Sequence, residues 1–168
     1  MSLFYEFDEV NSFTVGTRGQ PGERVFYLQA RSDEQRVTIK CEKQQAAAIA
    51  QYLRRVLADL PPPEDRPMSA TFELLEPLEP DFILGPVGLG YDRGNDRVLV
   101  QLEQVGELDE QGEPLEDEDR GHVRLYVSRG QAAAFCEHAD GVIEAGRPPC
   151  RWCGNPMDPD THDCPRMN

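Results

Sequence analysis

The chain has 168 residues, of which 39% are hydrophobic and 29% charged, and it carries a formal net charge of −14 at pH 7. This length and composition are typical of one globular domain with room for a small appendage. The acidic balance argues against binding to a phosphate backbone, which needs clustered lysines and arginines.

No apolar run approaches the roughly 20 residues that span a bilayer, so we expect no membrane insertion. The N-terminal sequence "MSLFYEFDEV" lacks the basic start and apolar core of a signal peptide. A cytoplasmic location is therefore the expectation.

An internal repeat organises most of the chain. Residues Val37–Leu53 ("VTIKCEKQQAAAIAQYL") resemble Val123–Ala139 ("VRLYVSRGQAAAFCEHA") at an offset of 86 residues, and Phe13–Ala30 resemble Phe82–Glu103. We expect two half-domains, at about residues 1–60 and 68–146.

Each half predicts strands followed by a helix. Apolar residues favour strands at 24–30 and 36–41 in the first half, and at 97–105 and 122–127 in the second. After each pair, apolar residues recur at i, i+3, i+4 and i+7, which predicts an amphipathic helix. They are Ala46, Ile49, Ala50, Leu53, Val56, Leu57 and Leu60, then Ala132, Phe135, Cys136, Ala139, Val142 and Ile143.

The proline-rich segment 61–67 ends the first helix and links the halves. The predicted fold class is α+β: a mainly antiparallel sheet covered by two helices that are related by a pseudo-two-fold axis. Cys41 and Cys136 fall in these strand and helix patterns, so we expect both to be small buried hydrophobic residues.

Two glycine-rich segments, 17–24 and 85–94, precede strands and lack a phosphate-loop signature, so they are typical of hairpin or bulge loops. An alternative is that the two loops together bind an anionic ligand, as an enzyme or small-molecule binder would. The candidate ligand-binding residues are Arg18, Arg24, Arg93 and Arg97.

The segment Glu107–Asp119 ("ELDEQGEPLEDED") holds eight acidic residues and no basic ones. This composition favours a solvated, flexible loop. A docking site for a basic partner or a cation-binding loop are the alternatives.

A cysteine-rich tail occupies residues 147–168. Cys150 and Cys153 form a Cys-x-x-Cys-Gly unit, and His162 and Cys164 form a tighter His-x-Cys pair. Three thiolates and one imidazole are the ligands of structural zinc, and four protein ligands leave no open position for a catalytic water. We therefore expect structural Zn²⁺ at these four residues, with unligated thiols or a redox pair as the alternatives.

The tail also holds the only tryptophan, Trp152, between the two cysteines of the first pair. It packs either on the chain's own domain or against a protein partner. Basic residues Arg147, Arg151 and Arg166 permit a zinc-ribbon nucleic-acid binder as a further alternative.

These motifs together resemble a known family. "FTVGTRGQPGERVFYLQA", "CEKQQAAAIAQYL" and "CRWCGNPMDPDTHDCPR" are similar, in this order, to an actinobacterial conserved family classed as a domain of unknown function. The resemblance covers essentially the whole chain, and it implies metal-type positions at the same four tail residues.

No Gly-x-Ser-x-Gly or His-Glu-x-x-His motif is present. The sequence therefore favours a non-enzymatic binding or adaptor protein with a structural zinc site and a protein partner.

Overall fold

The computed structural model describes residues 4–20, 22–67, 69–106, 110–113 and 120–145. Seven strands form one mixed sheet in the order β1-β7-β6-β5-β4-β3-β2. The strands are β1 (Phe4–Phe7), β2 (Ser12–Arg18), β3 (Val25–Arg31), β4 (Arg36–Cys41), β5 (Phe82–Asp92), β6 (Arg97–Gln104) and β7 (His122–Val127). Two helices, α1 (Lys43–Ala58) and α2 (Arg129–Glu144), and a short 3₁₀ helix, η1 (Ser69–Phe72), complete the fold. The chain is thus α+β, as predicted.

Both halves have the same order of elements. Three antiparallel strands and a helix (β2-β3-β4-α1) are followed by three antiparallel strands and a second helix (β5-β6-β7-α2). The halves join through two parallel contacts, where β5 pairs with β4 and β1 pairs with β7. The two contacts are alike in register. Phe82 lies beside Ile39 of β4, and Phe7 lies beside Leu125 of β7, which follows Ile39 by 86 residues.

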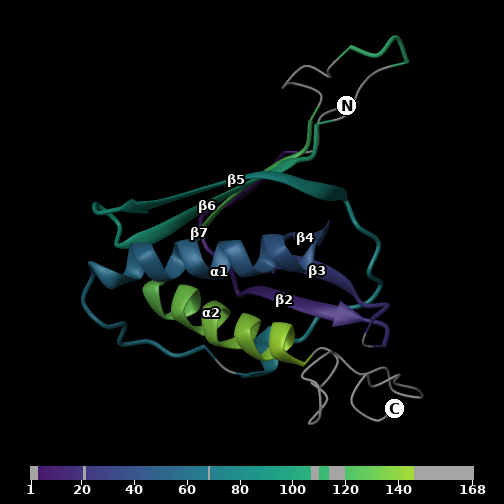
Figure 1. The fold of residues 1–168 in the computed structure, drawn as a ribbon. Helices are drawn as coiled ribbons and strands as arrows, with labels where there is room; N and C mark the ends of the chain where they lie inside the picture. The colour runs from purple at the N-terminus through teal and green to yellow at the C-terminus, as the bar shows by residue number, and fades with distance from the viewer. Residues whose placement is uncertain (1–3, 21, 68, 107–109, 114–119, 146–168) are drawn as a thin grey trace, which may run out of the picture.

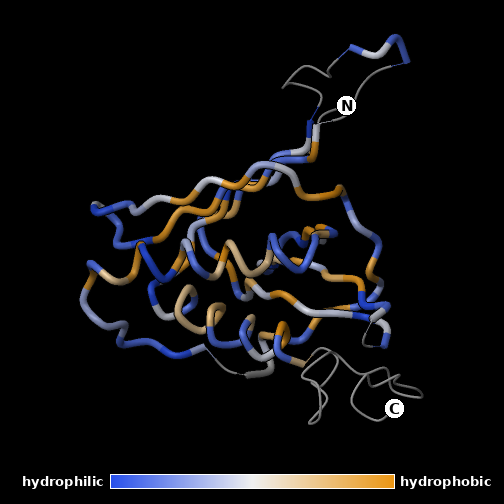
Figure 2. The backbone as a smooth tube through the Cα atoms, viewed as in Figure 1, coloured by the Kyte–Doolittle hydropathy of each residue, from blue (hydrophilic) through white to orange (hydrophobic). Residues whose placement is uncertain are grey.

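The two helices run side by side in opposite directions and pack against the sheet (Figure 1). Alternate residues of the strands and the apolar faces of both helices form one core. Figure 2 shows the apolar residues concentrated on these elements and the hydrophilic ones on their connections. At the crossing, the thiol of Cys136 donates to the carbonyl of Ala50, and Arg54 pairs with Asp140; both pairs are 86 residues apart. Both contacts between the helices thus join residues with the same sequence separation.

The linker between the halves is the segment between the end of α1 at Ala58 and the start of β5 at Phe82. It covers polar side chains of the first half. Thr14, which is buried, donates from Oγ1 to the carbonyl of Phe72 at 2.8 Å. The buried Gln29 binds the backbone of Leu75 twice, accepting from its N–H at 2.8 Å and donating to its carbonyl at 3.1 Å. These bonds satisfy polar groups that would otherwise be costly to bury.

The predicted strands and both helices are confirmed, but the segment 85–94, predicted as a hairpin or bulge loop, is mostly strand with one irregularity. Gly85, Gly88 and Gly90 lie within β5, which continues to Asp92 with an irregular register between Leu84 and Val87. The turn comes only at residues 93–96. The sequence patterns also missed β1 and both parallel contacts, because a four-residue strand has too few positions to show a period. Among the described residues, neither helix is long and apolar enough to cross a membrane.

Candidate functional site

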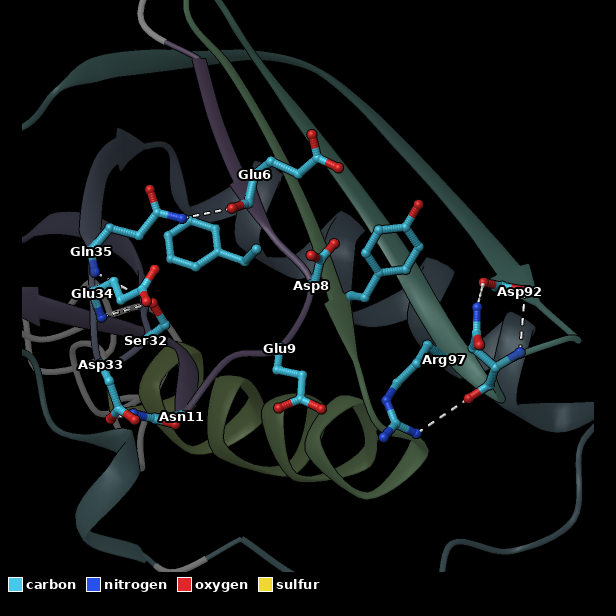
Figure 3. A pocket seen from close by; sticks show the side chains of 13 residues that line it. Glu6, Asp8, Glu9, Asn11, Ser32, Asp33, Glu34, Gln35, Asp92 and Arg97 are labelled. Atoms are coloured by element: carbon cyan, nitrogen blue, oxygen red, sulfur yellow. Dashed lines mark hydrogen bonds between the residues drawn. The ribbon is translucent and has the colours of Figure 1, made fainter.

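An acidic groove of about 750 Å³ lies between the β1–β2 connection, the β3–β4 turn and the β5–β6 turn. Its acidic residues are Glu6, Asp8, Glu9, Asp33, Glu34 and Asp92. Its other residues are Phe7, Asn11, Ser32, Gln35, Asn95, Arg97 and Tyr126. The groove is therefore lined by six acidic residues and one arginine. Figure 3 shows the first three carboxylates between the 32–35 turn on one side and the 92–97 turn on the other.

Hydrogen bonds fix the first side of the groove. Gln35 Nε2 donates to the carbonyl of Glu6 at 2.6 Å, which ties the β3–β4 turn to β1. Asn11 Nδ2 donates to Asp33 Oδ1 at 2.6 Å and ties the same turn to the start of β2. The bond at Glu6 uses its backbone carbonyl, so it does not engage the side-chain carboxylate of Glu6 (Figure 3).

The β5–β6 turn forms the second side. Asp92 accepts from Asn95 Nδ2 at 2.8 Å and from the Gly94 N–H at 3.0 Å. The Asn95 side chain is the main cause of a lowered pKa for Asp92, so this carboxylate stays charged in mild acid. Arg97 donates to the backbone carbonyls of Asp96 and Asn95, at 3.0 and 3.4 Å. Its guanidinium is thus partly engaged by its own turn.

The carboxylates of the groove are spread along it (Figure 3). In the part of the chain that the structure describes, no three His, Cys, Asp or Glu side chains converge closely enough to hold a metal ion. Carboxylates spread along an open groove accept hydrogen bonds from several cationic groups at once. The sequence patterns do not reveal this site because its acids lie at or beside the ends of strands that are distant in the chain. The signal was present as "EFDE" and "SDEQ" beside strand ends, but only the sheet topology shows that they meet.

The four predicted arginines do not share a cavity. Arg97 lines the acidic groove, Arg24 lines a second cavity, and Arg18 lines a third. The turns that carry Arg18 and Arg24 lie at the opposite end of the molecule from the β5–β6 turn with Arg93 (Figure 1). Arg18 pairs with Glu76 at 2.9 Å, and Arg24 Nη1 donates to the carbonyl of Val142 at 2.8 Å.

Cys41, Cys136 and His138 pack in or against the core of the protein. Cys41 and Cys136 are buried, as predicted. Burial raises their thiol pKa values to about 12 and about 11, which keeps both protonated and unreactive at neutral pH. His138 Nε2 lies 2.9 Å from the carbonyl of Val15, its ring stacks on Phe72, and burial lowers its pKa.

The predicted zinc ligands Cys150, Cys153, His162 and Cys164, together with Trp152, lie outside the described residues. So does most of the acidic segment 107–119.

A family model described as a protein of unknown function, DUF3090, matches residues 5–164. The chain belongs to the DUF3090 family. The DUF3090 match runs from β1 to the last predicted zinc ligand, so it includes both the acidic groove and the cysteine pair of the tail. No curated protein and no solved structure matches the chain.

Proposed function

We propose that this DUF3090 protein is a non-enzymatic binding or adaptor protein whose acidic groove holds a lysine- or arginine-rich segment of a protein partner. The observation that carries the proposal is the set of six carboxylates distributed along one open groove of about 750 Å³. Lysine and arginine side chains are long, so consecutive ones on an extended peptide can each reach a different carboxylate. Hydrogen bonds within the walls hold the groove in place before a partner arrives, which lowers the entropy cost of binding.

A labelled peptide of ten lysines tests this proposal by fluorescence anisotropy. The triple variant Glu6→Gln, Asp8→Asn and Glu9→Gln removes three charges from the groove. Because exposed charge pairs each contribute about 0.2–1 kcal/mol, we expect roughly tenfold weaker binding. Affinity for the unaltered protein should also fall as salt rises.

The matched control is the triple variant Glu23→Gln, Asp59→Asn and Glu137→Gln, which removes the same charge from exposed residues outside the groove. It should keep most of the affinity. Equal losses in both triple variants would mean that the peptide senses only the net charge of the protein, and the proposal would be wrong.

We further propose that the tail holds one structural Zn²⁺ through Cys150, Cys153, His162 and Cys164. The support is the ligand chemistry and spacing: a Cys-x-x-Cys-Gly pair and a His-x-Cys pair supply four soft or borderline ligands. Elemental analysis of untagged protein should find about one zinc per chain. Full zinc occupancy in a Cys153→Ser variant would show that the ligand assignment is wrong.

We also infer that the two halves are copies of one ancestral unit. The support is the shared order of elements, the repeated "QAAA" at the start of each helix, and the 86-residue separation of the pairs that meet where the helices cross. In both helices the glutamine of that motif accepts from the backbone N–H of the capping residue at 2.9 Å: Gln45 from Glu42, and Gln131 from Ser128.

A further inference from the structure

The acidic groove contains one partly exposed aromatic side chain, Tyr126. The other aromatic residue of its lining, Phe7, is only 1% exposed and belongs to the core. Side chains alternate along β7, so Tyr126 lies on the face of the sheet opposite to the buried Leu125 and Val127. The ring of Tyr126 is therefore accessible to an occupant of the groove.

Tyr126 is not engaged by the rest of the described chain. Among the described residues, its ring has no aromatic or cationic neighbour, and its hydroxyl has no hydrogen-bond partner. Other tyrosines differ: the hydroxyl of Tyr5 donates to Asp81 at 3.0 Å, and the guanidinium of Arg55 lies 5.6 Å from the ring centre of Tyr52. Both the face and the hydroxyl of Tyr126 are thus available to a ligand.

Exposed carboxylates lie on the β1 side of Tyr126. β1 pairs with β7 in parallel up to Phe7 and Leu125, so Asp8, the next residue, continues towards the level of Tyr126. Asp8 and Glu9 are both exposed, and Figure 3 shows them in the middle of the groove. Within the described residues, neither carboxylate takes part in a hydrogen bond or an ion pair. The groove thus combines an aromatic face with unpaired carboxylates.

A guanidinium matches this combination better than an ammonium does. It is planar, so it stacks on an aromatic ring while its N–H fork binds a carboxylate through two hydrogen bonds. An ammonium is a compact and strongly hydrated charge that offers neither contact as well. The chain itself contains the stacked arrangement, with the guanidinium of Arg24 lying 4.9 Å from the ring centre of Phe26. The six acidic residues of the groove supply the charge that attracts such a cation.

We propose that the groove selects arginine over lysine, with an arginine of the partner segment stacked on Tyr126 and paired to Asp8. This selectivity rests on the groove binding proposed above and names the residue type that the partner carries. The groove's own guanidinium, Arg97, is bonded to the carbonyls of Asp96 and Asn95 in the β5–β6 turn. Because like charges repel, the partner's arginine occupies the β1 side of Tyr126, away from that turn.

Labelled peptides of ten arginines and of ten lysines test the selectivity by fluorescence anisotropy on the full chain, at one salt concentration. The readout is the ratio of the two affinities, because a general loss of charge weakens both peptides. Tyr126→Leu should lower the preference for arginine by roughly threefold, as loss of an exposed cation–π contact does. Its affinity for the lysine peptide should change less, which also shows that the variant is folded. Tyr126→Phe retains the ring and should retain the ratio.

The matched control is Tyr27→Leu, which removes a partly exposed tyrosine of β3 that lies outside the groove. It should leave the ratio at the value of the unaltered protein. An unchanged ratio in Tyr126→Leu, a drop in Tyr126→Phe, or an equal drop in Tyr27→Leu would overturn the proposal.

The lysine peptide separates failure of the selectivity from failure of groove binding. If the triple variant of Glu6, Asp8 and Glu9 binds it as tightly as the unaltered protein does, groove binding is wrong and the selectivity fails with it. If that variant weakens lysine binding but Tyr126→Leu leaves the ratio unchanged, the selectivity alone is wrong.

Discussion

Burial determines the chemistry of several ionisable side chains. Cys41 and Cys136 have the sulfur chemistry of a nucleophile or metal ligand, but both are buried and their raised pKa values keep them as thiols. Asp92 lies at the surface of the groove, where hydrogen bonds from Asn95 and Gly94 favour its charged form. Burial thus keeps the core cysteines protonated, whereas hydrogen bonds lower the pKa of Asp92 in the groove.

His138 should make stability fall in mild acid. Burial lowers its pKa below the ordinary value of 6.5, so the unfolded chain binds a proton before the folded chain does. The stability contributed by neutral His138 is complete above about pH 6.5, and it is lost as the pH falls towards the lowered folded pKa. We expect urea unfolding to show a smaller drop in stability between pH 7 and pH 5 for His138→Gln than for the unaltered chain.

The control for this prediction is His122→Gln, on the partly exposed first residue of β7. It should not reduce the drop, because a protonated His122 would pair with Glu103, 3.6 Å away. An unchanged drop in the His138 variant would assign the acid sensitivity to carboxylates instead.

At the level of helices and strands, both helices have the same capping interaction at the N-terminus. Gln45 and Gln131 each accept from the backbone N–H of the capping residue, and each also donates to a carbonyl of the other half, Leu84 or Val10. One side chain thus caps a helix and joins it to the neighbouring half. This explains physically why a glutamine opens the repeated "QAAA" motif.

Two glycines of α2 should respond in opposite directions to the same substitution. Gly130→Ala forces a Cβ against Asp65 in the linker, and overpacking of this kind costs about 1–3 kcal/mol. Gly141→Ala places its Cβ in open space, and alanine in a helix is about 0.5–1 kcal/mol more favourable than glycine. Thermal unfolding should therefore show a lower Tm for the first variant and a higher Tm for the second. A loss in both would mean that α2 resists substitution for another reason.

In the molecule as a whole, the linker helps to join the two halves. It follows α1, caps α2 through Asp65, and then covers polar groups of β2 and β3 through the backbone of Phe72 and Leu75. These bonds join side chains of the sheet to backbone groups of the linker. They attach the linker to the sheet without strand pairing. The parallel strand contacts, the helix crossing and the linker thus all join the halves, in addition to the bonds of Gln45 and Gln131.

Gln29→Leu should weaken this attachment. The variant removes both partners of the Leu75 backbone groups, and leaving such groups unpaired costs about 1–3 kcal/mol. Gln101→Leu, on a partly exposed side chain of β6 in the other half, should change stability by less than about 0.5 kcal/mol. Denaturant unfolding measures both, and equal effects would show that the linker bonds contribute nothing specific.

The sequence alone was enough to predict the strands at 36–41 and 122–127, both amphipathic helices and the α+β class. These follow from local periodicity, because alternate strand residues and one face of each helix must be apolar to form a core. The sequence also predicts the zinc ligands by their spacing. By contrast, the place of β1 beside β7, the course of β5 through Gly85–Gly90 and the acidic groove were decided only by the tertiary structure. The groove brings together residues such as Glu6, Asp33 and Asp92, which are distant in the chain, and no local pattern records which strand ends will meet.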